Sequence, residues 1–256
     1  PETKVTASSL GLGAQRLAVG AGGDDQLKDG VLNLSGQLLT DVNGSRRLQL
    51  RAYQGIDLYR DVVLGSATMD KLTLDTPLLR GVGTAEQVAQ VLAREVVLSN
   101  RTGRTAASET GGSQVRIEAK PVRRDGRTGG LTVGASASSD SGLAANGQHL
   151  AFVNAVLASQ GDVIFDQRGK LSSQADLHIE AARVTATTDS DQTVAAGGAL
   201  VVSKADGAST LGESLGAGGA LTLSGQRVEQ GGVIDIESGK LTVQGTGQGG
   251  RNDTVV

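Results

Sequence analysis

Two stretches in the C-terminal part of the chain resemble each other, "AAGGALVVSK" at residues 195–204 and "GAGGALTLSG" at residues 216–225. In both, Gly-Gly-Ala-Leu leads into a short alternating run, starting at Gly197 and again at Gly218, 21 positions later. A glycine pair before such a run predicts a corner with positive φ followed by a β-strand. Recurrence at this interval predicts a unit that stacks on copies of itself.

Similar runs occur along most of the chain. They are short, rich in Leu, Val and Ile, and bounded by Gly, Asn, Asp or Ser, which is typical of strands. They begin at Val31, Leu48, Leu72, Val96, Val115, Leu131, Val163, Leu177, Leu200, Leu221 and Leu241. Spacings near 20 residues fit the coils of a solenoid better than the closer turns of an antiparallel sandwich. We therefore predict an all-β solenoid of roughly 12 coils, a rod near 60 Å long with alternate Leu and Val inside.

The composition fits a thin aliphatic interior. Of 256 residues, 38 are Gly, 3 are Pro and only four are aromatic, whereas an enzyme of this size usually builds its pocket from more aromatic area. The absence of Cys excludes disulfides and thiolate sites. A net charge of −3 without a strongly basic face argues against nucleic-acid binding. Pro1 stands where an initiator Met would be, so we interpret the chain as a piece of a longer protein.

One segment is ambiguous. Residues 84–95, "TAEQVAQVLARE", split into two strand-like runs, but Ala85, Val88, Ala89 and Leu92 also have helical spacing behind a Thr-x-x-Gln start. We favour strands, with a short lateral helical insert as the alternative.

Residues 48–81, "LQLRAYQGIDLYRDVVLGSATMDKLTLDTPLLRG", resemble a block of filamentous-haemagglutinin-like exoproteins of Gram-negative bacteria. The shared pattern is a strand, then Tyr-x-x-Ile-Asp-Leu-Tyr, then a Leu-Thr-Leu-Asp strand. "VVLSN" at 96–100 and the glycine-rich series "GGALVVS", "LGAGGALTLSG" and "SGKLTVQG" are similar to the way such proteins continue. The resemblance covers about residues 30–248.

This resemblance implies a right-handed parallel β-helix, residues 1–256 forming a single segment of a long adhesin of the two-partner secretion class. Such proteins are secreted to the cell surface through a dedicated outer-membrane transporter, which an amino-terminal domain recruits. We find no equivalent of that domain here, so the resemblance implies an internal segment. The chain departs from the pattern in its charged inserts, notably the basic loop insert at 118–130.

That insert supplies the candidate binding residues. Clustered arginines bind sulfated or other anionic glycans bidentately. The candidate residues are Arg116, Lys120, Arg123, Arg124 and Arg127. A solvated loop between two coils is the alternative that we favour.

Other polar residues suggest sites only weakly. Asp24, Asp25 and Asp29 follow a glycine pair but do not meet the calcium-binding nonapeptide even once, so we expect no metal site. Glycosidase chemistry needs paired carboxylates in a groove lined with aromatic residues. Asp162 with Asp166, or Asp235 with Glu237, are the candidate pairs, while His149 and His178 lack a nucleophile signature. We interpret all of these as ordinary solvated side chains and expect no cofactor.

Two further patterns concern the surface. Asn43, Asn100 and Asn252 begin Asn-x-Ser/Thr sequons, which arise easily by chance in such a chain. Tyr53 and Tyr59 would share a face of an unbroken strand, but Gly55 between them argues for a corner.

We therefore expect a non-catalytic, monomeric rod that acts as a structural and adhesive shaft in host or biofilm attachment, with host or matrix glycans or proteins as partners. Two alternatives remain, a carbohydrate-active β-helix enzyme and a stalk that delivers a distant toxin domain.

Overall fold

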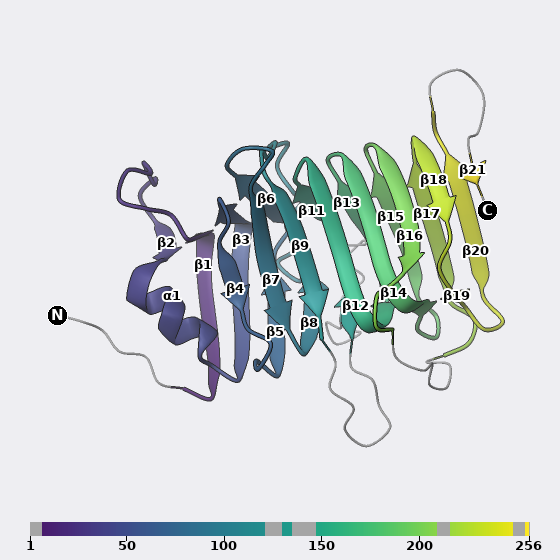
Figure 1. The fold of residues 1–256 in the computed structure, drawn as a ribbon, viewed down its shortest axis with the longest axis horizontal. Helices are drawn as coiled ribbons and strands as arrows, with labels where there is room; N and C mark the ends of the chain where they lie inside the picture. The colour runs from purple at the N-terminus through teal and green to yellow at the C-terminus, as the bar shows by residue number, and fades with distance from the viewer. Residues whose placement is uncertain (1–6, 121–129, 135–146, 209–215, 248–253, 256) are drawn as a thin grey trace.

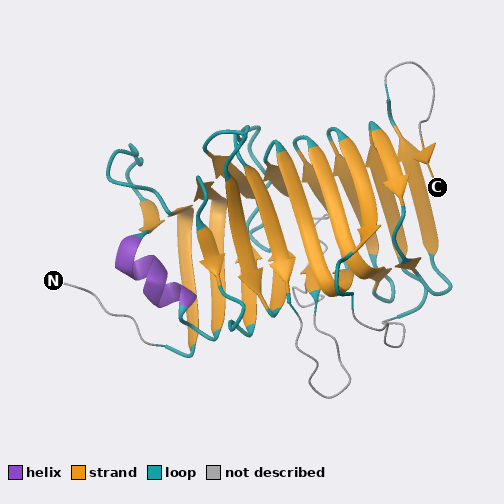
Figure 2. Ribbon diagram, viewed as in Figure 1, coloured by secondary structure: helices purple, strands orange, loops and turns teal. Residues whose placement is uncertain are grey.

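The chain folds into a parallel β-helix whose coils stack along one axis (Figure 1). The structure is a computed structural model that describes residues 7–120, 130–134, 147–208, 216–247 and 254–255. Every strand pairing within these residues is parallel, and the strands form three sides, which we call sides A, B and C. Figure 2 shows the strands as successive rungs, with one helix at the N-terminal end of the stack.

Side A begins with the first halves of two long strands and ends near the C-terminus. Its strands, in stacking order, are β1 (Ser9–Val19), β3 (Arg47–Tyr59), β5 (Lys71–Asp75), β8 (Glu95–Ser99), β10 (Leu131–Val133), the ends of β12 (Asn154–Phe165) and β14 (Asp176–Ala186), and β19 (Ile234–Asp235).

Sides B and C complete each coil. Side B contains β2 (Val31–Leu34), the second halves of β1 and β3, β6 (Leu78–Val82), β11 (Gln148–Ala151), β13 (Arg168–Ser173), β15 (Asp191–Ala196), β17 (Ala220–Gly225) and β20 (Lys240–Gly245). Side C contains β4 (Val63–Gly65), β7 (Val88–Ala93), β9 (Gln114–Ala119), the first halves of β12 and β14, β16 (Ala199–Lys204), β18 (Arg227–Gln230) and β21 (Thr254–Val255).

The register places like residues above one another. On side A, Leu48 lies opposite Leu72 and Leu72 opposite Val96, and the column continues through Leu131, Val163 and Val184. All six side chains are buried. The inward direction of alternate Leu and Val is therefore confirmed, and each buried residue covers its equivalent in the next coil.

The predicted number of coils is too high. Within the described residues, sides A and C have eight rungs each and side B has nine, which at the usual strand separation gives about 35–40 Å instead of 60 Å. Coils without inserts repeat at 20–24 residues, as between Leu48 and Leu72. Others are much longer, as between Val96 and Leu131, because loops leave the stack.

The copies that begin at Gly197 and Gly218 do not stack on each other, although the sequence predicts that they would. The first copy opens β16 on side C, where Leu200 pairs with Leu177 and Val228. The second opens β17 on side B, where Leu221 pairs with Gln192 and Leu241. The two copies therefore begin strands on two different sides of the helix. Gly218 has the predicted positive φ of 84°, whereas Gly197 lies where a Cβ would overlap the Gln174 carbonyl oxygen.

The ambiguous segment at 84–95 belongs to the stack, so the lateral helix is wrong. Ala89, Val91 and Ala93 of β7 are buried, and their alternation follows the strand period. The sequence analysis missed helix α1 (Gly36–Asn43), which lies beside β4 at the N-terminal end. Its Val42 is buried in the core, and Leu38 and Leu39 pack against that core. No helix in the described part of the chain has the length and apolar character needed to cross a membrane.

The register provides a matched test of core stacking. Leu221→Ala is expected to lower the free energy of unfolding by about 2–5 kcal/mol, because it leaves a cavity between rungs. Leu241 occupies the next position in the same column but is 44 % exposed, so Leu241→Ala should cost less than half as much. Chemical denaturation of both variants measures this. Equal losses would contradict the stacked register.

Candidate functional site

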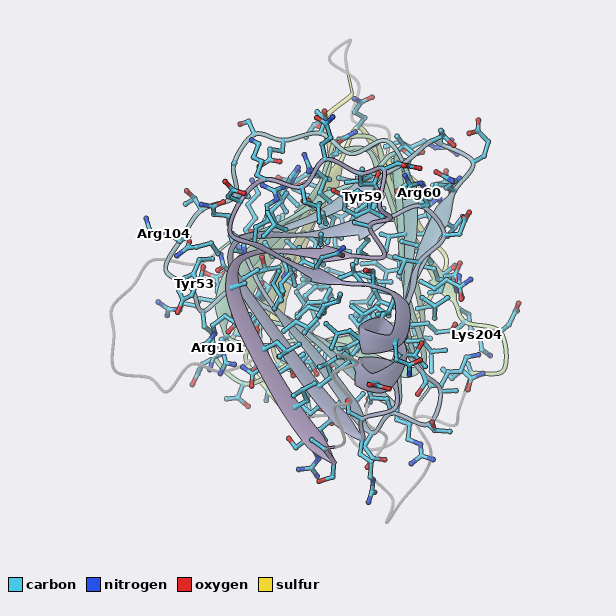
Figure 3. All side chains as sticks on the ribbon, turned by 90° about the vertical axis from the view of Figure 1, so that its left-hand side faces the viewer. Tyr53, Tyr59, Arg60, Arg101, Arg104 and Lys204 are labelled. Atoms are coloured by element: carbon cyan, nitrogen blue, oxygen red, sulfur yellow. The ribbon has the colours of Figure 1, made fainter. Side chains whose placement is uncertain are left out.

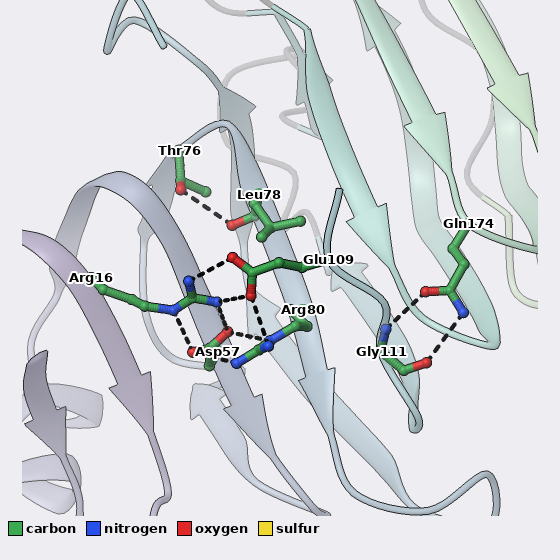
Figure 4. Close-up of polar contacts among 8 residues, drawn as sticks. All are labelled: Arg16, Asp57, Thr76, Leu78, Arg80, Glu109, Gly111 and Gln174. Atoms are coloured by element: carbon green, nitrogen blue, oxygen red, sulfur yellow. Dashed lines mark hydrogen bonds and ion pairs between the residues drawn. The ribbon is translucent and has the colours of Figure 1, made fainter. Parts of the chain in front are cut away.

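A cluster of four charged side chains lies on the outer surface of side B (Figure 4). Arg16 of β1, Asp57 of β3 and Arg80 of β6 come from three consecutive rungs, and Glu109 comes from the loop after β8. The three strand residues occupy outward positions, between inward residues such as Leu17 and Leu58. The stack therefore brings together residues that are far apart in the sequence.

Each carboxylate bridges both arginines. Arg16 donates from Nε and Nη2 to Asp57 at 2.7 and 2.8 Å, and Arg80 donates from Nε and Nη2 to the same carboxylate at 2.8 and 3.1 Å. Glu109 accepts from Nη1 and Nη2 of Arg16 at 2.8 and 2.7 Å and pairs with Arg80 Nη1 at 2.7 Å. Only 4 % of the Asp57 side chain is exposed. The network is closed, in the sense that each of the four groups is paired with both groups of opposite charge, and it contains two positive and two negative charges.

The hydrogen bonds favour the ionised forms of Arg16 and Glu109. Those that Arg16 donates to Asp57, and then those to Glu109, raise the pKa of Arg16, and burial opposes them only partly. The hydrogen bond from Arg16 lowers the pKa of Glu109 below its ordinary value of 4.5. Removing one member of a shielded ion-pair network leaves its partner's charge uncompensated, which costs more than the intact network contributes.

The loop that carries Glu109 is fixed at both ends. Asn100 donates from Nδ2 to the carbonyl oxygens of Arg104 at 2.8 Å and Gly147 at 2.7 Å. Farther along, Gly111 N–H donates to Gln174 Oε1 at 2.8 Å, and Gln174 Nε2 donates back to the Gly111 carbonyl at 3.2 Å. Because residues 100–113 leave side B, β6 pairs directly with β11.

A second loop, residues 20–30, covers the neighbouring part of side B. Asp25 accepts two hydrogen bonds from Arg60, at 2.8 and 2.7 Å, and a third from Gly22 N–H. Tyr59, which is 9 % exposed, packs with Ala18 and Ala21 beneath this loop. Burial raises the pKa of the Tyr59 hydroxyl.

Between this loop and the four-charge cluster lies a pocket of about 460 Å³. Arg16, Asp57 and Arg80 from three rungs line it together with Glu109. The rest of its wall is formed by Gln15, Gln26, Leu27, Lys28, Asp29, Gly30, Val31, Gln54 and Tyr59. We call this cavity the side-B pocket and take it as the candidate site.

The predicted glycan site is only partly described. Arg116 donates from Nη2 to Glu180 Oε2 at 2.9 Å, and its Nε lies 3.7 Å from Glu118. Lys120 Nζ lies 3.6 Å from the same Glu118. Arg123, Arg124 and Arg127 lie outside the described residues. Both described cations have carboxylate neighbours, which reduces the charge they offer to an anionic glycan, and the glycan site stays a prediction.

Three of the four candidate acids and one of the two histidines are engaged in local interactions. Asp162 forms a buried pair with Arg183, at 3.1 and 2.9 Å, and Asp235 approaches the same guanidinium at 3.3 Å. Thr187 donates to Asp166 at 2.6 Å. His149 Nδ1 lies 2.9 Å from Ser172 Oγ, and burial lowers its pKa. Searching the described residues for groups of three or more metal-ligating side chains finds none.

The structure also shows the surroundings of two of the three sequon asparagines and of both tyrosines. Asn43 donates from Nδ2 to the Val63 carbonyl and accepts from Gly65 N–H, which fastens α1 to β4. Asn100 is 6 % exposed and both N–H groups of its side-chain amide donate hydrogen bonds, so its nitrogen is not free for a glycan in the folded chain. Asn252 lies outside the described residues. Tyr53 and Tyr59 lie on different flanks of the molecule, in agreement with a corner at Gly55 (Figure 3).

Sequence reasoning missed the four-charge cluster. A signal exists, because Asp57 and Arg80 are each a single charge inside a short apolar run and Arg16 directly precedes one. Glu109 has no such signal, since it lies in a polar stretch without periodicity.

Comparison of the chain with protein-family models, with curated proteins and with solved structures finds no match. The resemblance to filamentous-haemagglutinin-like exoproteins therefore rests on the quoted residues.

Glu109 should make folding sensitive to acid. Its pKa is lower in the folded protein than in the unfolded chain, so its stabilisation is present above pH 4.5 and is lost as the pH falls through the folded value. Glu109→Gln is expected to cost about 1–2 kcal/mol at neutral pH and to flatten the loss below pH 4.5. Denaturation across pH measures both. Glu237→Gln, at an exposed position, is the control, and an unchanged acid profile in Glu109→Gln would contradict the assignment.

Gly111 should be required for the position of the loop. A Cβ on this residue would overlap the Ala151 carbonyl oxygen, so Gly111→Ala must displace residues 100–113 from side B. We expect a loss of about 1–3 kcal/mol and faster proteolysis within the loop. Gly11→Ala is the control, because a Cβ there meets no atom within 4 Å. Equal protease resistance of the two variants would show that the loop is not held as described.

Proposed function

We propose that this chain is a structural and adhesive shaft segment of a secreted filamentous adhesin at the surface of a Gram-negative bacterium. It acts through stiffness and surface contact and performs no catalysis. In this proposal the segment is a monomeric rod within a longer exoprotein, exported by a two-partner transporter. The single observation that carries it is the parallel hydrogen-bonded stack on three sides, which gives each coil two neighbours to pair with.

Ion pairs between coils support the same role. Asp70 lies between Arg46 and Arg94, which approach it from the preceding and following coils at 2.7 and 2.8 Å. Lys71 pairs with Glu95 at 2.6 Å in the same register. Surface pairs contribute little energy individually. The alternating sign of Arg46, Asp70 and Arg94 nevertheless avoids the repulsion that identical stacked charges would produce.

Attachment of immobilised protein tests the proposal. Beads that carry the folded chain through one terminal tag are expected to adhere to cultured cells or abiotic surfaces several-fold better than beads carrying an inert protein of similar mass. Attachment no better than this control would overturn the adhesive role. Turnover of a polysaccharide in a substrate panel would favour the carbohydrate-active alternative.

A further inference from the structure

The side-B pocket is a feature that a shaft does not need. Its volume of about 460 Å³ is within the range of small-molecule sites, roughly 300–1,000 Å³. It exists because two loops rise from the stack on either side of an otherwise regular surface. Both loops are fastened, one by the Arg60–Asp25 pair and the other by Glu109 and Gly111.

The charges around the pocket are balanced. The positive groups of its wall are Arg16, Lys28 and Arg80, and the negative groups are Asp29, Asp57 and Glu109. Both arginines already donate to two carboxylates. These arginines could pair with an anionic ligand only by releasing one of those carboxylates, and the remaining cation, Lys28, is offset by Asp29 in the same wall, so the pocket favours a ligand without net charge.

The wall also offers free hydrogen-bonding groups. Gln15, Gln26 and Gln54 are exposed, and their side-chain amides form no hydrogen bond with any other described residue. Each amide supplies two donors and one acceptor in a plane. Three such groups around one cavity match a ligand that has several adjacent hydroxyls.

The remaining wall is apolar. Leu27 and Val31 pack around Tyr59, and all three residues line the cavity. An aromatic residue and aliphatic groups beside planar polar groups suit the two kinds of surface on a sugar ring, its C–H faces and its hydroxyl rim. A flexible peptide would present fewer hydroxyls to the three amides.

We propose that the side-B pocket binds one or two sugar units of an uncharged glycan. Gln15, Gln26 and Gln54 form hydrogen bonds with its hydroxyls, and the closed four-charge cluster provides a rigid floor. This site is distinct from the predicted anionic-glycan site at Arg116 and Lys120. The proposal also goes beyond the shaft role, because this chain alone would bind the glycan, whether or not it is part of a filament.

Saturation-transfer NMR and calorimetry on the whole chain test the proposal. The probes are the neutral disaccharides maltose, cellobiose and lactose, followed by an array of neutral glycans, with a heparin disaccharide as the charged probe. We expect at least one neutral saccharide to bind with an affinity that does not change with salt, since no net charge is neutralised. The Gln15→Ala/Gln26→Ala/Gln54→Ala variant should bind it at least tenfold more weakly with an unchanged unfolding transition.

The control is Gln90→Ala/Gln244→Ala, which removes two exposed amides outside the pocket and should bind as the parent does. Absence of binding to every neutral probe would overturn the proposal. So would unchanged affinity in the triple variant, salt-sensitive binding of the heparin disaccharide alone, or capture of a peptide library in place of sugars. The two proposals fail separately. Beads that do not adhere, in an experiment where soluble saccharides still bind, would overturn the adhesive role and leave the sugar site standing.

Discussion

In-register pairing of each coil with the next holds the whole molecule together. Apart from the strands at the two ends of the stack, every described strand takes its hydrogen bonds from the coils before and after it, so no inner rung is complete without its neighbours. The same register places Leu48, Leu72 and Val96 in one buried column. Leu241 shows the converse, because its inward-facing side chain remains 44 % exposed where no described strand covers it.

Stacking also governs the charged residues. Identical charges one above another repel at the close spacing of paired strands, so alternating sign stabilises a charged column. Arg46, Asp70 and Arg94 form such a column. Asp57 and Arg80 are likewise in register, and Arg16, which lies opposite Gly55, reaches Asp57 from the rung before, while Glu109 adds the fourth charge.

Loops that leave the stack give the surface its individual features. A regular rung offers a flat strip of side chains, whereas the loops at 20–30 and 100–113 enclose the side-B pocket. The second loop also removes one rung from side B, so that β6 meets β11. The features that could distinguish one ligand from another therefore lie where the repeat is interrupted.

The all-β solenoid, the inward direction of alternate Leu and Val, and several true stacking intervals can be predicted from the sequence, including Leu48 to Leu72 and Leu221 to Leu241. These follow from strand periodicity, which is local. Helix α1 also has a local signal, because Leu38, Leu39 and Val42 have helical spacing. The run is short, and the sequence analysis did not predict a helix there. The positions of the copies at Gly197 and Gly218 on different sides follow from the coil pairings and not from the sequence, because similar corners precede strands on more than one side. The tertiary structure alone brought Glu109 to Arg16, 93 residues away in the chain, because loop lengths set which surfaces meet and periodicity does not encode them.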